Sequence, residues 1–294
     1  MPRRLPYALL DVFTSRPLTG NALAVFTDAR ALDAGEMQAL ARETNLSETT
    51  FVLPDPAAPP GAPVRARIFT VAEELPFAGH PTLGTAFAVR GASRAAEVAL
   101  ELAVGVIPVA FEDRPEGAFG EMRQRDPVLG HVHAHADVAR ALGLPEGELD
   151  SDLPVQTVST GLPFAVVPFR SLATLARLRA DWSRTEAWLA GTDARFLYLV
   201  CRETSEPAAR IHARMIFYGG EDPATGSAAG CCAAWMVAHG VARPDEPVVI
   251  EQGLEIRRPS RLHVRAGRDA GGRVRDVRVG GHVVEVGRGE LLIA

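Results

Sequence analysis

The sequence predicts an α+β protein made of two copies of one domain, each a curled, mostly antiparallel sheet around a buried central helix. Two nearly apolar helical segments occupy corresponding places in the two halves, and the strands around them are short, valine-rich and bounded by turn residues. A third observation is a repeat with an offset of 147 residues, half of the 294-residue chain. The repeated identities include Glu74, Pro76 and Gly79, which recur as Glu221, Pro223 and Gly226.

The elements of the first half follow from apolar runs between turn residues. A helix is expected over 34–44, because Asp33 can cap it and Met37, Leu40 and Ala41 share one face. Strands are expected at 7–13, 22–27, 51–54 and within 98–112.

The second half repeats this order. A helix is expected over 172–178, and strands are expected at 155–159, 164–168, 196–200 and within 274–293. We place one domain at 1–125 and the other at 126–282.

The two repeated helices are unusual because they lack a polar face. HPTLGTAFAVRG (80–91) and SAAGCCAAWMVAHG (227–240) are apolar or small nearly all round, so each is expected to be buried within its own sheet. Burial leaves the first amide groups of each helix without an intrahelical partner. Helix N-termini also carry partial positive charge, so the two starts would suit an anion such as a carboxylate.

Three side chains near these helix starts, and one further acid, are candidates for chemistry. The string GEDPATGSAAG supplies Asp222 and Ser227, and EELPFAGHPTLG places His80 at the position that matches Ser227. Glu48, in NLSETTFVLP, lies between a helix end and a strand start. Structural alternatives stay open, because Asp222 and Ser227 could simply cap a helix and Glu48 could be a solvated acid.

Composition excludes several classes of function. All 31 basic residues are arginine, so Schiff-base chemistry, lysine-bound pyridoxal phosphate and a P-loop lysine are excluded. The net charge of −5 without a basic stripe argues against a nucleic-acid partner. No stretch is long and apolar enough to span a membrane, and no dinucleotide fingerprint is present, so we expect a cytoplasmic protein without a cofactor.

One histidine run offers a weaker alternative. His131, His133 and His135 alternate as strand neighbours on one face would, and three such side chains could bind zinc in a metal-dependent hydrolase. Only Asp137 lies near them as a further ligand. Because 126–154 is rich in glycine and proline, we interpret the segment as a solvated linker with no metal site.

These strings together resemble the PhzF family of phenazine-biosynthesis-type isomerases. The resemblance rests on NLSETTFVLP, ELPFAGHPTLGTAFA, EDPATGSAAG and QGLEIRRPS, and it extends from DVFTSRPLTGNALAVF to GRGELLIA. It implies a diaminopimelate-epimerase-like fold of two pseudo-symmetric domains with the active site in the cleft between them. It also implies that 283–294 returns to the first domain and that the protein is a homodimer.

The resemblance further implies roles for individual residues. Glu48 matches the proton-shuttling acid of the family, and His80, Asp222 and Ser227 match its supporting residues. Related racemases carry a cysteine at each central-helix start, but this sequence has Ala78-Gly79-His80 and Ala224-Thr225-Gly226 there, which disfavours a two-thiol racemase.

The resulting hypothesis is a cofactor-free isomerase that moves a proton between carbons of a small carboxylate. Amides near Gly79, Thr225 and Gly226 would bind the carboxylate. A non-catalytic carboxylate-binding protein is the competing hypothesis.

Overall fold

The computed structural model describes residues 2–217 and 220–293 and divides into two compact units. Unit 1 contains the residues up to Arg123 together with those from Gly280 onward, and unit 2 contains Gln124–Val279. The sequence placed this division at 125/126 and the return of the chain at 283.

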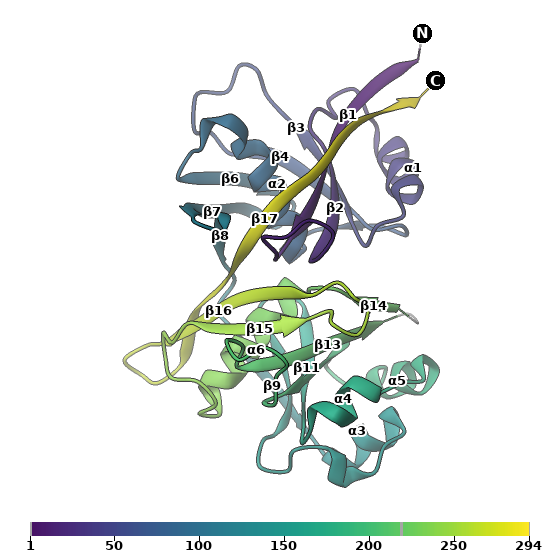
Figure 1. The fold of residues 1–294 in the computed structure, drawn as a ribbon, viewed down its shortest axis with the longest axis vertical. Helices are drawn as coiled ribbons and strands as arrows, with labels where there is room; N and C mark the ends of the chain where they lie inside the picture. Colours follow the sequence, from purple (N-terminus) through teal and green to yellow (C-terminus); the bar gives the residue numbers. More distant parts are fainter. Residues whose placement is uncertain (1, 218–219, 294) are drawn as a thin grey trace. The chain divides into compact units, whose positions relative to one another are not determined.

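Unit 1 is a mixed sheet with two helices. Its elements are β1 (Arg3–Val12), β2 (Asn21–Phe26), α1 (Ala34–Thr44), β3 (Thr49–Leu53), β4 (Val64–Phe69), β5 (Glu74–Leu75), α2 (Gly79–Arg90), a 3₁₀ turn (Gly91–Ser93), β6 (Glu97–Leu102), β7 (Gly105–Arg114) and β8 (Gly117–Arg123). The second part of β17 (Val274–Ile293) completes the unit by pairing antiparallel with β1 (Figure 1).

Unit 2 repeats the same order with two additional helices. Its elements are β9 (Val128–His133), α3 (His135–Leu142), a 3₁₀ turn (Glu146–Glu148), β10 (Val155–Ser159), β11 (Pro163–Phe169), α4 (Leu172–Arg177), α5 (Trp182–Leu189), β12 (Phe196–Cys201), β13 (Ile211–Phe217), β14 (Gly220–Asp222), α6 (Gly226–Ala238), β15 (Val248–Gln252), β16 (Ser260–Arg268) and the first part of β17.

The strand pairings of the two units correspond one to one. In unit 1, β1–β2 is antiparallel, β2–β3 parallel, β3–β4 antiparallel, β4–β6 parallel and β6–β7 antiparallel. In unit 2, β10–β11, β11–β12, β12–β13, β13–β15 and β15–β16 repeat those directions. The predicted α+β fold of two pseudo-symmetric domains is therefore confirmed.

The apolar helices α2 and α6 each pack against several strands of their own unit. Helix α6 is buried from Ala228 to Val237, and α2 is buried over most of its length. Small residues permit this close packing. A Cβ at Gly84 would lie 2.6 Å from Leu23 Cδ2, and a Cβ at Gly230 would lie 1.9 Å from Gln124 Oε1.

Helix α1 forms where its N-terminal signal predicts it. The Asp33 carboxylate accepts from the Glu36 amide, and the Glu36 side chain accepts from the Asp33 amide, which is a capping box. Met37, Leu40 and Ala41 are buried on the inner face.

The interpretation of 126–154 as a solvated linker is wrong. This segment contains β9 and α3, and β9 pairs antiparallel with β10. Val138 and Leu142 of α3 lie in the core of unit 2, so an amphipathic helix was hidden by its short length and by the neighbouring glycines and prolines.

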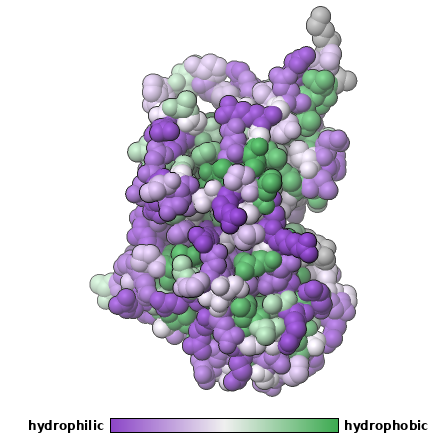
Figure 2. Space-filling model, viewed as in Figure 1, coloured by the Kyte–Doolittle hydropathy of each residue, from purple (hydrophilic) through white to green (hydrophobic). Residues whose placement is uncertain are grey.

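One face of the surface shows the distribution of polar and apolar residues. The face drawn in Figure 2 is mainly hydrophilic with scattered apolar areas, and exposed large apolar side chains include Leu18, Val128 and Val132. None of the helices within 2–217 and 220–293 is long and apolar enough to cross a membrane.

Candidate active site

In unit 1, the start of α2 brings an imidazole next to a carboxylate. His80 is the second residue of α2, and only 3% of its surface is exposed. Its Nδ1 accepts a hydrogen bond from Asn21 Nδ2 at 3.1 Å, and its Nε2 lies 3.4 Å from Glu48 Oε2. Glu48 precedes β3 directly, and its side chain is 17% exposed, so it is not the solvated acid of the structural alternative.

The protonation state of His80 follows from its surroundings. Burial lowers its pKa to about 3, so the ring is neutral at pH 7. Because Nδ1 accepts from Asn21, the single ring proton is on Nε2 and faces Glu48. Among the described residues, His80 Nε2 has no hydrogen-bond partner, and 3.4 Å exceeds the usual length of such a bond. This buried N–H can therefore donate to a bound molecule.

In unit 2, a second polar group surrounds the start of α6. Asp222 is the last residue of β14 and is buried, and Thr225 Oγ1 donates to Asp222 Oδ2 at 2.6 Å. Gln252 Nε2 donates to the Asp222 carbonyl at 2.8 Å, and Gln252 Oε1 accepts from the Thr225 amide at 3.2 Å. Tyr198 Oη also donates to Gln252 Oε1, at 3.0 Å.

Sequence reasoning assigned no role to Asn21, Tyr198 or Gln252. The sequence carried a signal for two of them, because Gln252 opens the string QGLEIRRPS and Asn21 lies in DVFTSRPLTGNALAVF, and both strings belong to the family resemblance. Tyr198 lies in the strand run FLYLV, and only the fold reveals the contacts of all three.

The helix starts themselves lack side-chain caps. The N-cap residues Ala78 of α2 and Thr225 of α6 make no capping hydrogen bond through their side chains. The interpretation of Asp222 and Ser227 as simple helix caps is therefore wrong, because the Asp222 carboxylate accepts from the Thr225 hydroxyl and Ser227 is the second residue of α6. Gly79 and Gly226, the first residues of the two helices, are buried with their amides at the positive ends of the helix dipoles.

The candidate residues thus form two groups, one in each unit. Unit 1 contains Gly79, His80 and Glu48, and unit 2 contains Asp222, Thr225, Gly226 and Ser227. Each group combines titratable or hydroxyl side chains with a buried helix start, which suits proton transfer on an anionic molecule.

The cysteines of α6 are not nucleophiles of this site. Cys231 and Cys232 are fully buried, and burial raises the pKa of the Cys231 thiol to about 11 and that of Cys232 further. Both thiols are protonated at neutral pH and pack inside unit 2.

The histidine run does not converge on a metal. His133 Nε2 contacts Thr157 Oγ1 at 2.8 Å, while His135 Nε2 contacts the Leu153 carbonyl at 2.9 Å from the first turn of α3. Across 2–217 and 220–293, no group of three His, Cys, Asp or Glu side chains is placed to hold a metal ion.

Comparisons with known proteins identify the family of the chain. The family model described as phenazine biosynthesis-like protein, PhzC-PhzF, matches residues 10–289. An uncharacterized isomerase of Mesorhizobium japonicum is 40% identical, with 98% of each chain covered. A trans-2,3-dihydro-3-hydroxyanthranilate isomerase of Pseudomonas aeruginosa is 38% identical, with 94% of this chain and 95% of that protein covered.

Solved structures show the same fold. A PhzF-family phenazine biosynthesis protein of Bacillus anthracis superposes with a TM-score of 0.89 at 28% identity, covering 99% of this chain and 100% of that one. A probable proline racemase of Agrobacterium radiobacter superposes with a TM-score of 0.67 at 12% identity, covering 98% of this chain and 92% of that one.

Proposed function

The chain belongs to the PhzC-PhzF family of phenazine biosynthesis-like proteins and is an isomerase, and on that premise we propose that it moves a proton between two carbons of a small carboxylate. The reaction uses acid/base groups of the protein and no cofactor. Because a relative at 38% identity is a trans-2,3-dihydro-3-hydroxyanthranilate isomerase, this compound is the first substrate to test.

Glu48 is the proton carrier in this proposal. Its carboxylate removes a proton from an activated carbon, the double-bond electrons shift, and the same carboxyl returns the proton to another carbon. The His80 Nε2–H, held toward Glu48 by Asn21, donates a hydrogen bond as negative charge develops on the substrate.

Unit 2 supplies the anion-binding and polarising groups. The amides near Gly226 and the Ser227 hydroxyl bind a carboxylate, while Asp222, buried next to Thr225, polarises the substrate. In unit 1, the amide of Gly79 at the start of α2 is an anion-binding group of the same kind.

The observation that carries the proposal is the contact of 3.4 Å between Glu48 Oε2 and a buried, neutral His80. Glu48→Gln keeps the shape of the side chain but cannot accept and return a proton. Turnover of trans-2,3-dihydro-3-hydroxyanthranilate should fall by at least ~10²-fold, while binding measured by calorimetry and the unfolding midpoint persist.

Glu43→Gln is the matched control, because Glu43 is an exposed acid at the end of α1. A Glu48→Gln variant that turns over substrate like the control would remove Glu48 from the mechanism. If the wild-type protein binds carboxylates but exchanges none of their carbon-bound protons with deuterated water, the chain is the non-catalytic carboxylate-binding protein instead.

A further inference from the structure

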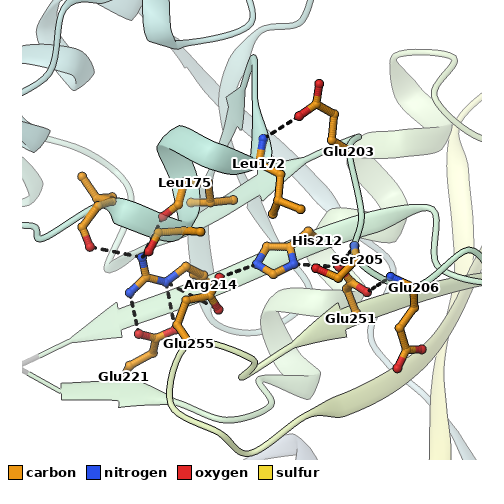
Figure 3. Close-up of polar contacts among 12 residues, drawn as sticks. Leu172, Leu175, Glu203, Ser205, Glu206, His212, Arg214, Glu221, Glu251 and Glu255 are labelled. Carbon is orange, nitrogen blue, oxygen red and sulfur yellow. Dashed lines mark hydrogen bonds and ion pairs between the residues drawn. The ribbon is translucent and has the colours of Figure 1, made fainter.

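Strand β13 of unit 2 carries a buried ionic cluster that the proposed reaction does not use (Figure 3). We call it the β13 cluster, and its members are His212, Arg214, Glu221, Glu251 and Glu255. The two basic side chains are two residues apart on β13, which places them on one face of the strand. Buried charges of this kind are costly unless they are paired, so the pairing must be specific.

His212 lies between two carboxylates and is 1% exposed. Its Nδ1 donates to Glu251 Oε1 at 2.7 Å, and its Nε2 donates to Glu255 Oε1 at 2.9 Å. Only the doubly protonated ring can donate at both nitrogens. Burial by itself would lower the pKa of His212, but the hydrogen bonds with Glu255 and Glu251 raise it above its ordinary value.

Arg214 joins β14 to the end of α4. Its guanidinium donates to both Glu221 oxygens, at 3.0 and 2.6 Å, and to the carbonyls of Leu175 and Leu178 at 2.7 and 3.1 Å. This fork of donors holds Glu221 in a single position.

The cluster is adjacent in sequence to the polar group at the start of α6. Glu221 directly precedes Asp222 on β14, and Glu251 directly precedes Gln252 on β15. Successive strand side chains point to opposite faces of a sheet. The cluster therefore anchors β14 and β15 from one face, while Asp222 and Gln252 project from the other.

The turn after β15 links the cluster to this group a second time. Gly253 has a φ of +80°, and a Cβ there would lie 2.6 Å from the Pro223 carbonyl oxygen and 2.4 Å from that of Arg258. The turn thus packs tightly on the residue that follows Asp222. Glu255, within this turn, is held by His212.

Glu255 is the weaker of the two carboxylate anchors. Glu251 also accepts from the amides of Ser205 and Glu206, at 2.6 and 2.8 Å. Glu255 Oε2, in contrast, is buried and has no hydrogen-bond partner among the described residues, with Arg214 Nε 3.9 Å away. A neutral His212 would keep one N–H. The shorter contact, with Glu251 at 2.7 Å against 2.9 Å for Glu255, favours keeping it on Nδ1 and leaves Glu255 without its donor.

We propose that the β13 cluster positions Asp222, Thr225 and Gln252 for catalysis, and that loss of one proton from His212 releases the 253–258 turn and misplaces them. His212 and Arg214 are then positioning residues, and the inference rests on the proposed role of Asp222. The groups that face His212 are Glu251 on β15, Glu255 in the turn, Arg214 on β13 and Cys201, its register partner on β12.

The first test measures the link between His212 protonation and the position of Thr225 without measuring turnover. Nitrogen-15 NMR of the full-length protein should show His212 protonated at both ring nitrogens at pH 6.5. As pH rises, the backbone amide of Thr225 should shift with the same midpoint as His212. This measurement needs no substrate, so it can succeed even where the proposed function fails.

Kinetic variants test the effect on the reaction. His212→Gln should lower kcat on trans-2,3-dihydro-3-hydroxyanthranilate by about tenfold or more, with a smaller change in KM. Displacing Asp222, which polarises the substrate, affects the reaction more than it affects binding through the Gly226 amide and the Ser227 hydroxyl. The fall of kcat at alkaline pH, which we attribute to loss of a proton from His212, should disappear from the pH profile. Adding Glu255→Gln to this variant should recover kcat, because the amide introduced in the turn can donate to the side-chain oxygen of the amide introduced on β13.

A control and a milder variant keep the proposal falsifiable. His239→Gln changes a partly buried histidine of the same unit that contacts Gln156, and it should leave kcat and the pH profile unchanged. If His212→Gln does not fold, Glu255→Gln alone should move the alkaline limb to lower pH. The proposal would be overturned if the chemical shift of the Thr225 amide did not change as His212 titrates. It would also be overturned if His212→Gln and Glu255→Gln both kept the wild-type pH profile of kcat.

Discussion

His80 and His212 are both buried, yet their environments favour opposite protonation states. Next to Asn21 and Glu48, burial dominates and lowers the pKa of His80 to about 3. Between Glu251 and Glu255, burial is outweighed by two hydrogen bonds, and the pKa of His212 is raised. The difference decides their use, since a neutral imidazole can donate from one nitrogen to a substrate while an imidazolium bridges two acids.

The depressed pKa of His80 predicts acid sensitivity of the fold. In the unfolded chain this histidine binds a proton below its ordinary pKa of 6.5, whereas the folded state binds it only near pH 3. The free energy of unfolding should therefore decrease as pH falls from 6.5 toward 3. Urea unfolding at pH 7.0 and 4.5 measures this dependence.

His80→Gln should flatten that dependence, whatever its effect on absolute stability. The control is His131→Gln at an exposed histidine of β9. Identical pH dependence in wild type and His80→Gln would show that folding does not lower the pKa of His80.

Asn21 fixes which nitrogen of His80 carries the proton. In Asn21→Asp, the carboxylate would accept from Nδ1–H and leave an Nε2 lone pair facing Glu48. Turnover should fall by about 10²-fold, which is the usual effect of misplacing a group that acts on the substrate, and the fold should be retained. Ring nitrogen-15 shifts should report the reversed tautomer, and an unchanged tautomer with normal turnover would contradict this role.

At the scale of elements, α6 can be buried inside unit 2 because the residues on its packing surface are small. Gln124 Nε2 donates to the Gly226 carbonyl at 2.9 Å, and the same side chain lies where a Cβ on Gly230 would be. The helix start and the packing surface one turn later therefore share one glutamine.

Gly230→Ala should displace Gln124 and destabilise the protein by about 1–3 kcal/mol, the usual range for overpacking a core. Turnover should fall too, because the first turn of α6 would lose its anchor. Chemical unfolding and kinetics measure the two effects. Gly147→Ala is the control, since no atom lies within 4 Å of a Cβ there, and equal stability of both variants would contradict the packing argument.

At the scale of the molecule, the arrangement predicts catalysis without metal. His131, His133 and His135 separate into a strand and a helix start, and the described residues of both units hold no cluster of metal ligands. Untagged protein should keep its turnover after exhaustive chelation, with less than stoichiometric zinc by elemental analysis. Loss of turnover that zinc restores would contradict this. The homodimer stays a prediction, to be tested by sedimentation equilibrium.

Local sequence patterns were sufficient to predict most of the helices and strands. The bounds 34–44 of α1 and 155–159 of β10 agree with the expectation from sequence, because capping residues, apolar periodicity and turn residues act over a few neighbours. Helix α3 was missed because its eight residues give a short signal within a segment rich in glycine and proline.

The sequence by itself determined that two similar halves each bury an apolar helix. It placed His80 and Asp222 near the helix starts and singled out Glu48 between a helix end and a strand start. Only the tertiary structure decided their partners and charge states. Asn21 is 59 residues from His80, and Gln252 is 27 residues from Thr225. Burial and hydrogen bonding between distant segments control the pKa of a side chain, and no local pattern of residues encodes them.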